Sequence, residues 1–234
     1  MIQKVAIYGA GAIGGWLGAR LAAIGCDVSV VARGATLDAL RTQGLRLRAG
    51  DSESTHAVQT SDDPAALGVQ DLVIVAVKAP GMAEVARRIG PLIGHDTVVL
   101  TAMNGVPWWF LQGFGGPVAG RTLESVDPGG AIARAIPASQ VVGCVVHASC
   151  SLDAPGVIRQ RAGNGLIVGE PAGGETPRLR ALAALLTRAG FDVTPSPQIQ
   201  KDVWYKLWGN MTVNPVCAMT GASSDRVLDD ELVR

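Results

Sequence analysis

Apolar runs and helical patterns alternate over residues 4–110 and predict a parallel sheet. The predicted strands are short, β-branched and nearly continuous in apolar character, as in strands buried on both faces: residues 5–8, 28–31, 72–77 and 97–100. Helical spacing of apolar positions predicts helices between them, at residues 12–24, 36–43 and 82–89. Because strand and helix alternate, right-handed crossovers are expected. The pattern therefore predicts an α/β fold built on a doubly wound sheet.

The pattern changes after residue 140. Turn residues separate three expected strands, at residues 141–150, 156–160 and 166–168, with one of the turns at 163–165, and these strands predict an antiparallel extension of the sheet. An amphipathic helix and a last strand follow, at residues 178–189 and 191–194. Residues 113–138 hold six glycines and three prolines, a composition that fits either a lid over a site or a solvated connector.

Two prolines within residues 194–197 predict a hinge between two domains. The first domain would span residues 1–197. The second, at residues 198–234, is helical in pattern, with one helix at residues 200–219 and another that begins near Asp225.

Composition narrows the class of protein. Hydrophobic residues make up 48% of the chain, and 20 basic residues balance 20 acidic ones, so neither disorder nor a general attraction to nucleic acid or anionic lipid is expected. No apolar run reaches the roughly 18 residues of a membrane span, and the N-terminus lacks a signal-peptide pattern. The four cysteines form no CxxC pair and the three histidines are scattered, which argues against a metal site. We expect a cytoplasmic protein with reduced thiols.

A glycine-rich turn joins the first strand to the first helix. It matches GxGxxG and consists of Gly9, Ala10, Gly11, Ala12, Ile13 and Gly14. Such a motif alone is weak in a chain with 30 glycines, but here a strand precedes it and a helix follows. The glycines permit a tight turn and close approach of a pyrophosphate, which the helix N-terminus attracts. The context favours a dinucleotide site over a glycine-rich turn without a ligand.

Polar side chains at the ends of the predicted strands indicate which dinucleotide binds. The second strand ends at Arg33 with no Asp or Glu for a ribose 2′-hydroxyl, and a guanidinium there can bind a 2′-phosphate. The sequence therefore predicts NADP(H), although a surface arginine beside a turn remains the alternative. Lys78 and Asn104 follow two further strands, where they can contact the cofactor or a substrate, or simply be polar loop residues.

A polar stripe marks the last long helix. Lys206, Asn210 and Asn214 are spaced by four residues and share one helix face. Apolar residues flank the stripe: Trp204, Leu207, Trp208 and Met211. This arrangement favours a cleft over a partly exposed face with incidental asparagines. A kink is expected at Pro215.

Together these motifs resemble the ketopantoate reductase (2-dehydropantoate 2-reductase) family over essentially the whole chain. The resemblance rests on the Gly9 to Gly14 turn, Arg33, Val77-Lys78-Ala79, Asn104-Gly105 and the segment from Trp204 to Pro215. It implies a Rossmann-type N-terminal domain, the start of an all-helical second domain, and NADPH-dependent reduction of 2-dehydropantoate to pantoate, a step toward coenzyme A.

The resemblance also implies roles for single residues. Lys206 matches the family's general acid, and Asn104, Asn210 and Asn214 match its substrate-binding asparagines, of which Asn104 also touches the cofactor. Arg33 and Lys78 match cofactor contacts of the family, and Ser149 is a weaker match to another. An ammonium in the cleft can neutralise the charge left on the ketone oxygen and deliver a proton. It also favours an anionic 2-oxo acid.

Part of the family pattern has no counterpart in this chain. The helical domain would continue beyond Arg234 and carry a serine that binds substrate and a glutamate near the reaction centre, so we expect a missing segment rather than a natural short form. Two alternatives to a reductase of 2-dehydropantoate are a reductase of another 2-oxo acid and a non-catalytic NADP(H)-binding protein. The oligomeric state stays open, with a homodimer as one candidate.

Overall fold

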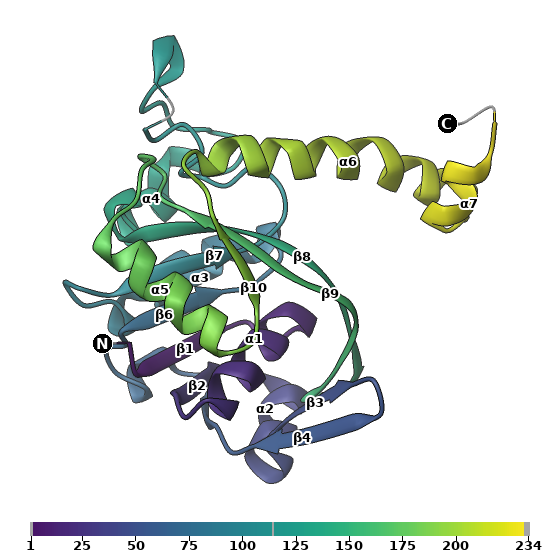
Figure 1. Cartoon of the computed structure of the whole chain (residues 1–234). Helices are drawn as coiled ribbons and strands as arrows, with labels where there is room; N and C mark the ends of the chain where they lie inside the picture. Colours follow the sequence, from purple (N-terminus) through teal and green to yellow (C-terminus); the bar gives the residue numbers. More distant parts are fainter. Residues whose placement is uncertain (1, 114, 232–234) are drawn as a thin grey trace.

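The computed structural model describes residues 2–113 and 115–231 and confirms an α/β fold around one curled sheet (Figure 1). Six strands run parallel in the order β5-β2-β1-β6-β7-β8. Their bounds are Gln59–Ser61, Asp27–Val31, Lys4–Tyr8, Leu72–Val75, Val98–Ala102 and Val141–Ala154, in that order. The strand order reverses between β1 and β6. At such a switch point a doubly wound sheet binds its ligand, outside the carboxyl ends of the strands.

The predicted antiparallel extension is present and is formed by β9 (Val157–Gly169), which pairs with β8. The predicted turn at residues 163–165 is wrong, because β9 is one continuous strand. Gly163 has a φ of 73°, and a Cβ there would lie 2.5 Å from the His147 carbonyl oxygen. The pairing register shifts between His147 and Ser149. Glycine therefore accommodates an irregularity inside the strand, where sequence reasoning expected a turn.

Three strands were not predicted. They are β3 (Leu45–Ala49), β4 (Ser52–His56) and the short β5. Arg46 and Arg48 interrupt the apolar pattern of β3, and every residue of β4 from Ser52 to Thr55 is exposed at the sheet edge. Glu53 holds the hairpin, since its carboxylate lies 2.6 Å from Arg48 Nε and 3.8 Å from Arg46 Nη1. An edge hairpin of this kind lacks the buried run that identifies a central strand.

Helices cover both faces of the sheet, as the crossovers require. α1 (Ala12–Ala23), α2 (Gly34–Gln43) and α5 (Pro177–Arg188) share a core with one face. α3 (Met82–Arg88) and α4 (Ala131–Ala135) share a core with the other. On the first face Trp16 is fully buried and meets the Phe191 ring edge-on at 4.8 Å between centroids. β10 (Asp192–Pro195) lies parallel to β9 and completes the sheet.

The glycine-rich stretch at residues 113–138 contains short 3₁₀ turns and α4; residue 114 lies outside the described part of the chain. Asp127 is only 1% exposed, and its carboxylate accepts hydrogen bonds from the backbone N–H groups of Ile132, at 2.7 Å, and Ala133, at 2.9 Å. This buried carboxylate satisfies donors at the start of α4 that have no partner within the helix. At least this part of the stretch is therefore ordered by a helix cap.

Replacing Asp127 by Ala is expected to lower the free energy of unfolding by about 1–2 kcal/mol, because two backbone donors lose their acceptor. Urea unfolding followed by tryptophan fluorescence measures this change. Glu124→Ala serves as the control, since Glu124 is exposed and accepts a single backbone hydrogen bond from Gly129. An unchanged midpoint for Asp127→Ala would contradict the capping role.

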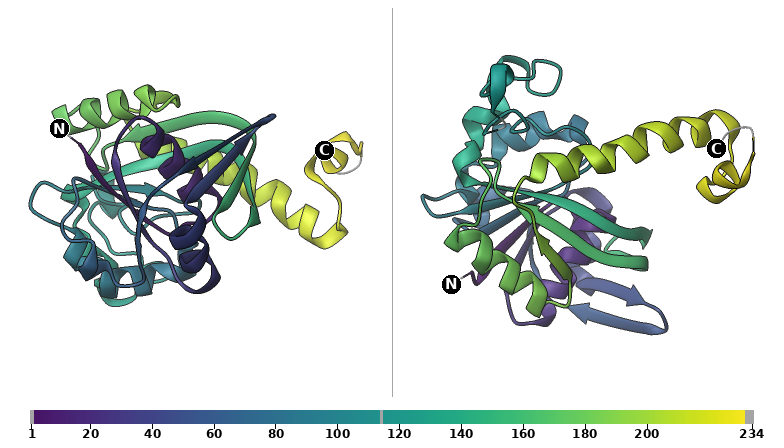
Figure 2. Two further views of the ribbon diagram at one scale, coloured as in Figure 1. Left: turned by 90° about the horizontal axis from the view of Figure 1, so that it is seen from below. Right: turned by 45° about the horizontal axis from the view of Figure 1, so that its top comes forward.

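The two predicted C-terminal helices are confirmed as α6 (Ile199–Thr220) and α7 (Ser224–Asp229). α6 begins over the sheet, where Ile199 and Val203 are buried, and then extends away from it (Figures 1 and 2). The helix continues past Pro215. The residues just before α6 are bonded to the sheet, since the Ser196 backbone N–H donates to Val168 O at 2.7 Å. In the part of the chain that the structure describes, no helix has the length and apolar character needed to cross a bilayer.

Candidate active site

The glycine turn lies at the switch point of the sheet. Gly9 follows β1 with a φ of 103°, and a Cβ there would lie 2.8 Å from Val77 Cγ1. A Cβ at Gly14 would lie 2.0 Å from the Gly9 carbonyl oxygen, so only glycine lets helix and strand approach this closely. A Cβ at Gly11, in contrast, would meet no atom within 4 Å. Open space in front of Gly11 at a helix N-terminus fits the pyrophosphate of a dinucleotide.

A cavity of about 440 Å³ extends from this turn to the end of β2. Its charged lining comes from Arg33 beyond β2 and from two residues of α3, Glu84 and Arg88. Arg33 Nη1 lies 2.6 Å from Glu84 Oε1, and Arg88 Nη1 lies 3.8 Å from the same oxygen. The structure thus places an acid beside Arg33 that sequence reasoning missed. The two residues are 51 positions apart, and the spacing along the chain carries no signal of their contact.

A second, much smaller cleft of about 10 Å³, space for about one water molecule, joins the end of β7 to α6. It is lined by Asn104, Lys206 and Asn210, together with Met103, Gly105, Val145, Val203 and Leu207. The Lys206 ammonium donates a hydrogen bond to the Val146 carbonyl oxygen at 2.6 Å. Lys206 is half-buried, and this burial lowers its pKa from the ordinary lysine value, while the neighbouring Cys144 thiol opposes the shift. Among the described residues that line this cleft, the arrangement brings together one cation and two amides.

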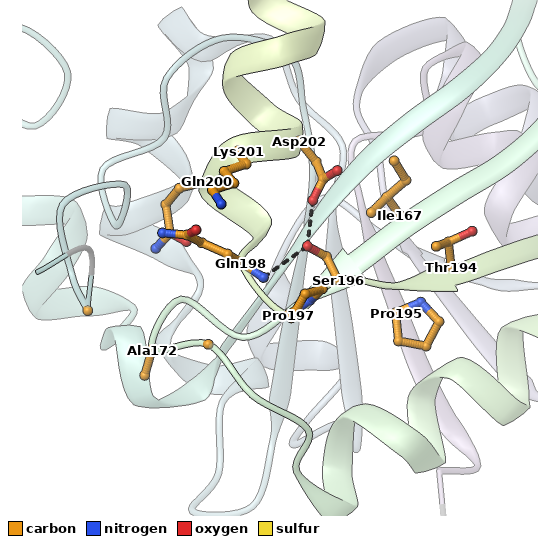
Figure 3. A pocket seen from close by; sticks show the side chains of 12 residues that line it. Ile167, Ala172, Thr194, Pro195, Ser196, Pro197, Gln198, Gln200, Lys201 and Asp202 are labelled. Carbon is orange, nitrogen blue, oxygen red and sulfur yellow. Dashed lines mark hydrogen bonds between the residues drawn. The ribbon is translucent and has the colours of Figure 1, made fainter.

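The first turn of α6 is anchored on the loops that follow β7 and β9, which fixes the position of Lys206 further along the same helix. Gln200 is 1% exposed, and its amide donates to Pro171 O at 2.6 Å and to Gln112 O at 3.3 Å. Ser196 donates to Asp202 and accepts from the Gln198 backbone N–H beside a cavity of about 570 Å³ (Figure 3). A side chain on a helix held in this way is presented more rigidly than one on a loop.

Three predicted site residues are not brought into these cavities. Asn214 is exposed, one turn of α6 beyond Asn210, and lines none of these cavities. Lys78 is exposed on the loop after β6, where its carbonyl oxygen accepts from the Gly81 backbone N–H at 2.8 Å. Ser149 is exposed on β8 at the register shift. Within residues 2–113 and 115–231, no three His, Cys, Asp or Glu side chains gather as metal ligands.

A glycine turn that opens a helix at the switch point of a parallel sheet defines the class of Rossmann-type dinucleotide-binding proteins. Comparison with known proteins extends this assignment. Residues 5–108 match the family model of ketopantoate reductase PanE/ApbA. A 2-dehydropantoate 2-reductase from Mesorhizobium japonicum is 43% identical over 233 residues, covering 99% of this chain and 72% of that protein.

Solved structures agree. A crystal structure from Ralstonia solanacearum MolK2, assigned as a ketopantoate reductase, superposes with a TM-score of 0.96 at 56% identity and covers 100% of this chain and 72% of the other. D-mandelate dehydrogenase with NADH and anilino(oxo)acetate has a TM-score of 0.81 at 19% identity and covers 99% of this chain and 69% of its own, which shows a shared fold only. The chain belongs to the ketopantoate reductase family of oxidoreductases.

Proposed function

We propose that the protein is a cytoplasmic, NADPH-dependent 2-dehydropantoate 2-reductase that forms pantoate on the route to coenzyme A. The observation that carries this proposal is the cleft in which Lys206, Asn104 and Asn210 meet at the carboxyl edge of the sheet. The 43% identical relative, which covers nearly the whole chain, is named for the same reaction. Residues 1–197 would form the cofactor domain, and residues 198–234 would begin the second, helical domain.

The residues around the glycine turn fit the cofactor. The open space at Gly11 leaves room for a pyrophosphate, and Arg33 supplies a guanidinium at the ribose end of the cavity. When bound, NADPH supplies the hydride chemistry, and the protein supplies binding, orientation and charge. Lys78 and Ser149 remain predicted cofactor contacts, and Asn214 a predicted substrate contact.

Lys206 is proposed to act as the proton donor. Reduction of a ketone leaves negative charge on its oxygen, and an ammonium within hydrogen-bond reach stabilises that charge and then transfers its proton. The lowered pKa of Lys206 makes this transfer easier. The hydrogen bond to Val146 O holds the amine in place while it changes charge. The amides of Asn104 and Asn210 can orient the substrate's carboxylate and hydroxyl oxygens.

The reaction is tested by mixing purified protein with NADPH and 2-dehydropantoate and following the loss of NADPH absorbance. Turnover of this substrate supports the proposal. A second candidate is a reductase of a bulkier 2-oxo acid, favoured by a largely apolar cavity of about 780 Å³ that shares Asn104 with the cleft. A panel of branched and aromatic 2-oxo acids distinguishes the two. If none of these 2-oxo acids supports the oxidation of NADPH, the remaining interpretation is a protein that binds the nucleotide without catalysis.

Replacing Arg33 by Ala is expected to weaken NADPH binding by about tenfold or more and to leave NADH binding within about twofold, because only NADPH carries the 2′-phosphate. Fluorescence titration of each cofactor measures both dissociation constants. Arg41→Ala is the control, since Arg41 is exposed on α2 and lines none of the cavities described above. Equal losses for the two cofactors would refute the assigned role of Arg33.

A further inference from the structure

Three charged side chains form a cluster at the ribose end of the cofactor cavity. The Glu84 carboxylate lies between two guanidinium groups, 2.6 Å from Arg33 and 3.8 Å from Arg88. Arg88 is itself held from behind, since its Nη2 donates to the Asp62 carbonyl oxygen at 2.7 Å. Arg33 is the most exposed member of the cluster, with 66% of its side chain exposed. The carboxylate therefore has a second cationic neighbour in the cavity, Arg88, in addition to Arg33.

The place of this cluster matters for nucleotide choice. The carboxyl end of the second parallel strand is where this fold receives the 2′ group of the adenosine ribose. Arg33 lies two residues past the end of that strand, and Glu84 faces it from α3 across the same cavity. A 2′-phosphate needs the guanidinium that Glu84 occupies and is repelled by the carboxylate. A 2′-hydroxyl, in contrast, is a donor and can bond to the carboxylate while the Arg33 pair stays intact.

We infer that Glu84 is a specificity-determining residue of this enzyme: by holding Arg33 and offering an acceptor to a ribose 2′-hydroxyl, it lets the site take NADH as well as NADPH. The inference rests on the proposed function, because it concerns the same cofactor cavity. Glu84 acts here in the way an acid at the end of the second strand acts in an NAD-specific site. It reaches that position from another element, which is why the end of the second strand shows no acid.

Glu84→Gln tests the inference by binding alone. The variant keeps the size of the side chain and removes its charge. We expect the ratio of the NADH to the NADPH dissociation constant to rise by about tenfold, mainly through tighter NADPH binding, when both are measured by fluorescence titration or calorimetry at fixed salt. Adding Arg33→Ala to the variant should abolish the gain, since the released guanidinium produces it.

Glu53→Gln is a matched control. Glu53 also bridges two arginines, at 2.6 Å and 3.8 Å, but it lies on the β3–β4 hairpin and lines none of the cavities described above. The Glu53→Gln substitution removes the same charge and should leave the ratio of the NADH to the NADPH dissociation constant unchanged. A ratio in Glu84→Gln within about threefold of native, or native protein that binds NADPH but not NADH, overturns the inference. Native protein that binds neither cofactor overturns the proposed function instead.

Discussion

Lys206→Ala is expected to lower kcat by about 1,000-fold or more while the dissociation constant of NADPH stays within about twofold of native. Among the described residues, the Lys206 ammonium is the one cationic side chain lining the cleft with Asn104 and Asn210, so its loss removes both the proton donor and the charge that stabilises the alkoxide. The Lys206 side chain lies outside the cavity beside Gly11, which is why cofactor binding should survive. Steady-state kinetics and fluorescence titration measure the two effects separately.

The control for this variant lies on the same helix. Lys201 is exposed near the start of α6 and does not line the cleft, so Lys201→Ala should retain kcat within about twofold. A Lys206→Ala enzyme that kept native kcat would remove Lys206 from the mechanism and leave the family assignment untouched. A variant that lost NADPH binding as well would instead point to a disturbed fold.

The pH profile of kcat carries the signature of the same group. The ammonium form donates the proton, so activity should fall as pH rises through the pKa of Lys206. Because burial lowers that pKa, the alkaline fall should begin below the pH at which an exposed lysine titrates. The fall should be absent from the residual activity of Lys206→Ala. An alkaline limb at the position of an exposed lysine would contradict the half-buried setting of the amine.

The central sheet could be predicted from the sequence because its strands are buried on both faces. β1, β6 and β7 each consist of a nearly continuous apolar run that few other structures accommodate. The edge hairpin β3–β4 could not, since its alternating arginines and polar residues are also what a solvated loop contains. β9 shows a third case. Glycine at position 163 usually marks a turn, but here the tertiary pairing with β8 keeps the strand continuous across it.

The candidate site residues also differ in whether local or long-range information determines where they lie. Strand ends and helical spacing are local, and together with the family resemblance they predicted that Asn104, Lys206 and Asn210 carry the chemistry; the structure brings these three to one cleft. Asn214 follows the same spacing, but α6 has left the sheet by then, and periodicity says nothing about where a helix loses its neighbour. Glu84 shows the converse, because its contact with Arg33 depends on how α3 packs beside β2.

Two glycines of the same turn should respond to alanine in opposite ways. Gly11→Ala places a methyl group in open space at a φ of −73°, so the free energy of unfolding should stay within about 0.5 kcal/mol of native. That methyl group occupies the approach of the pyrophosphate, and NADPH binding should weaken by about 100-fold. Urea unfolding and fluorescence titration measure the two quantities on the same preparation.

Gly14→Ala should instead lower the free energy of unfolding. Its Cβ would lie 2.0 Å from the Gly9 carbonyl oxygen and 3.0 Å from Ile7 Cγ2, and the backbone oxygen can move only if the whole turn shifts. Overpacking of this kind costs about 3 kcal/mol, more than the helix gains from alanine in place of glycine. Each variant is the control for the other. If Gly11→Ala kept native affinity, or Gly14→Ala kept native stability, the turn would not have the two separate functions of leaving room for a pyrophosphate and letting α1 pack against β1.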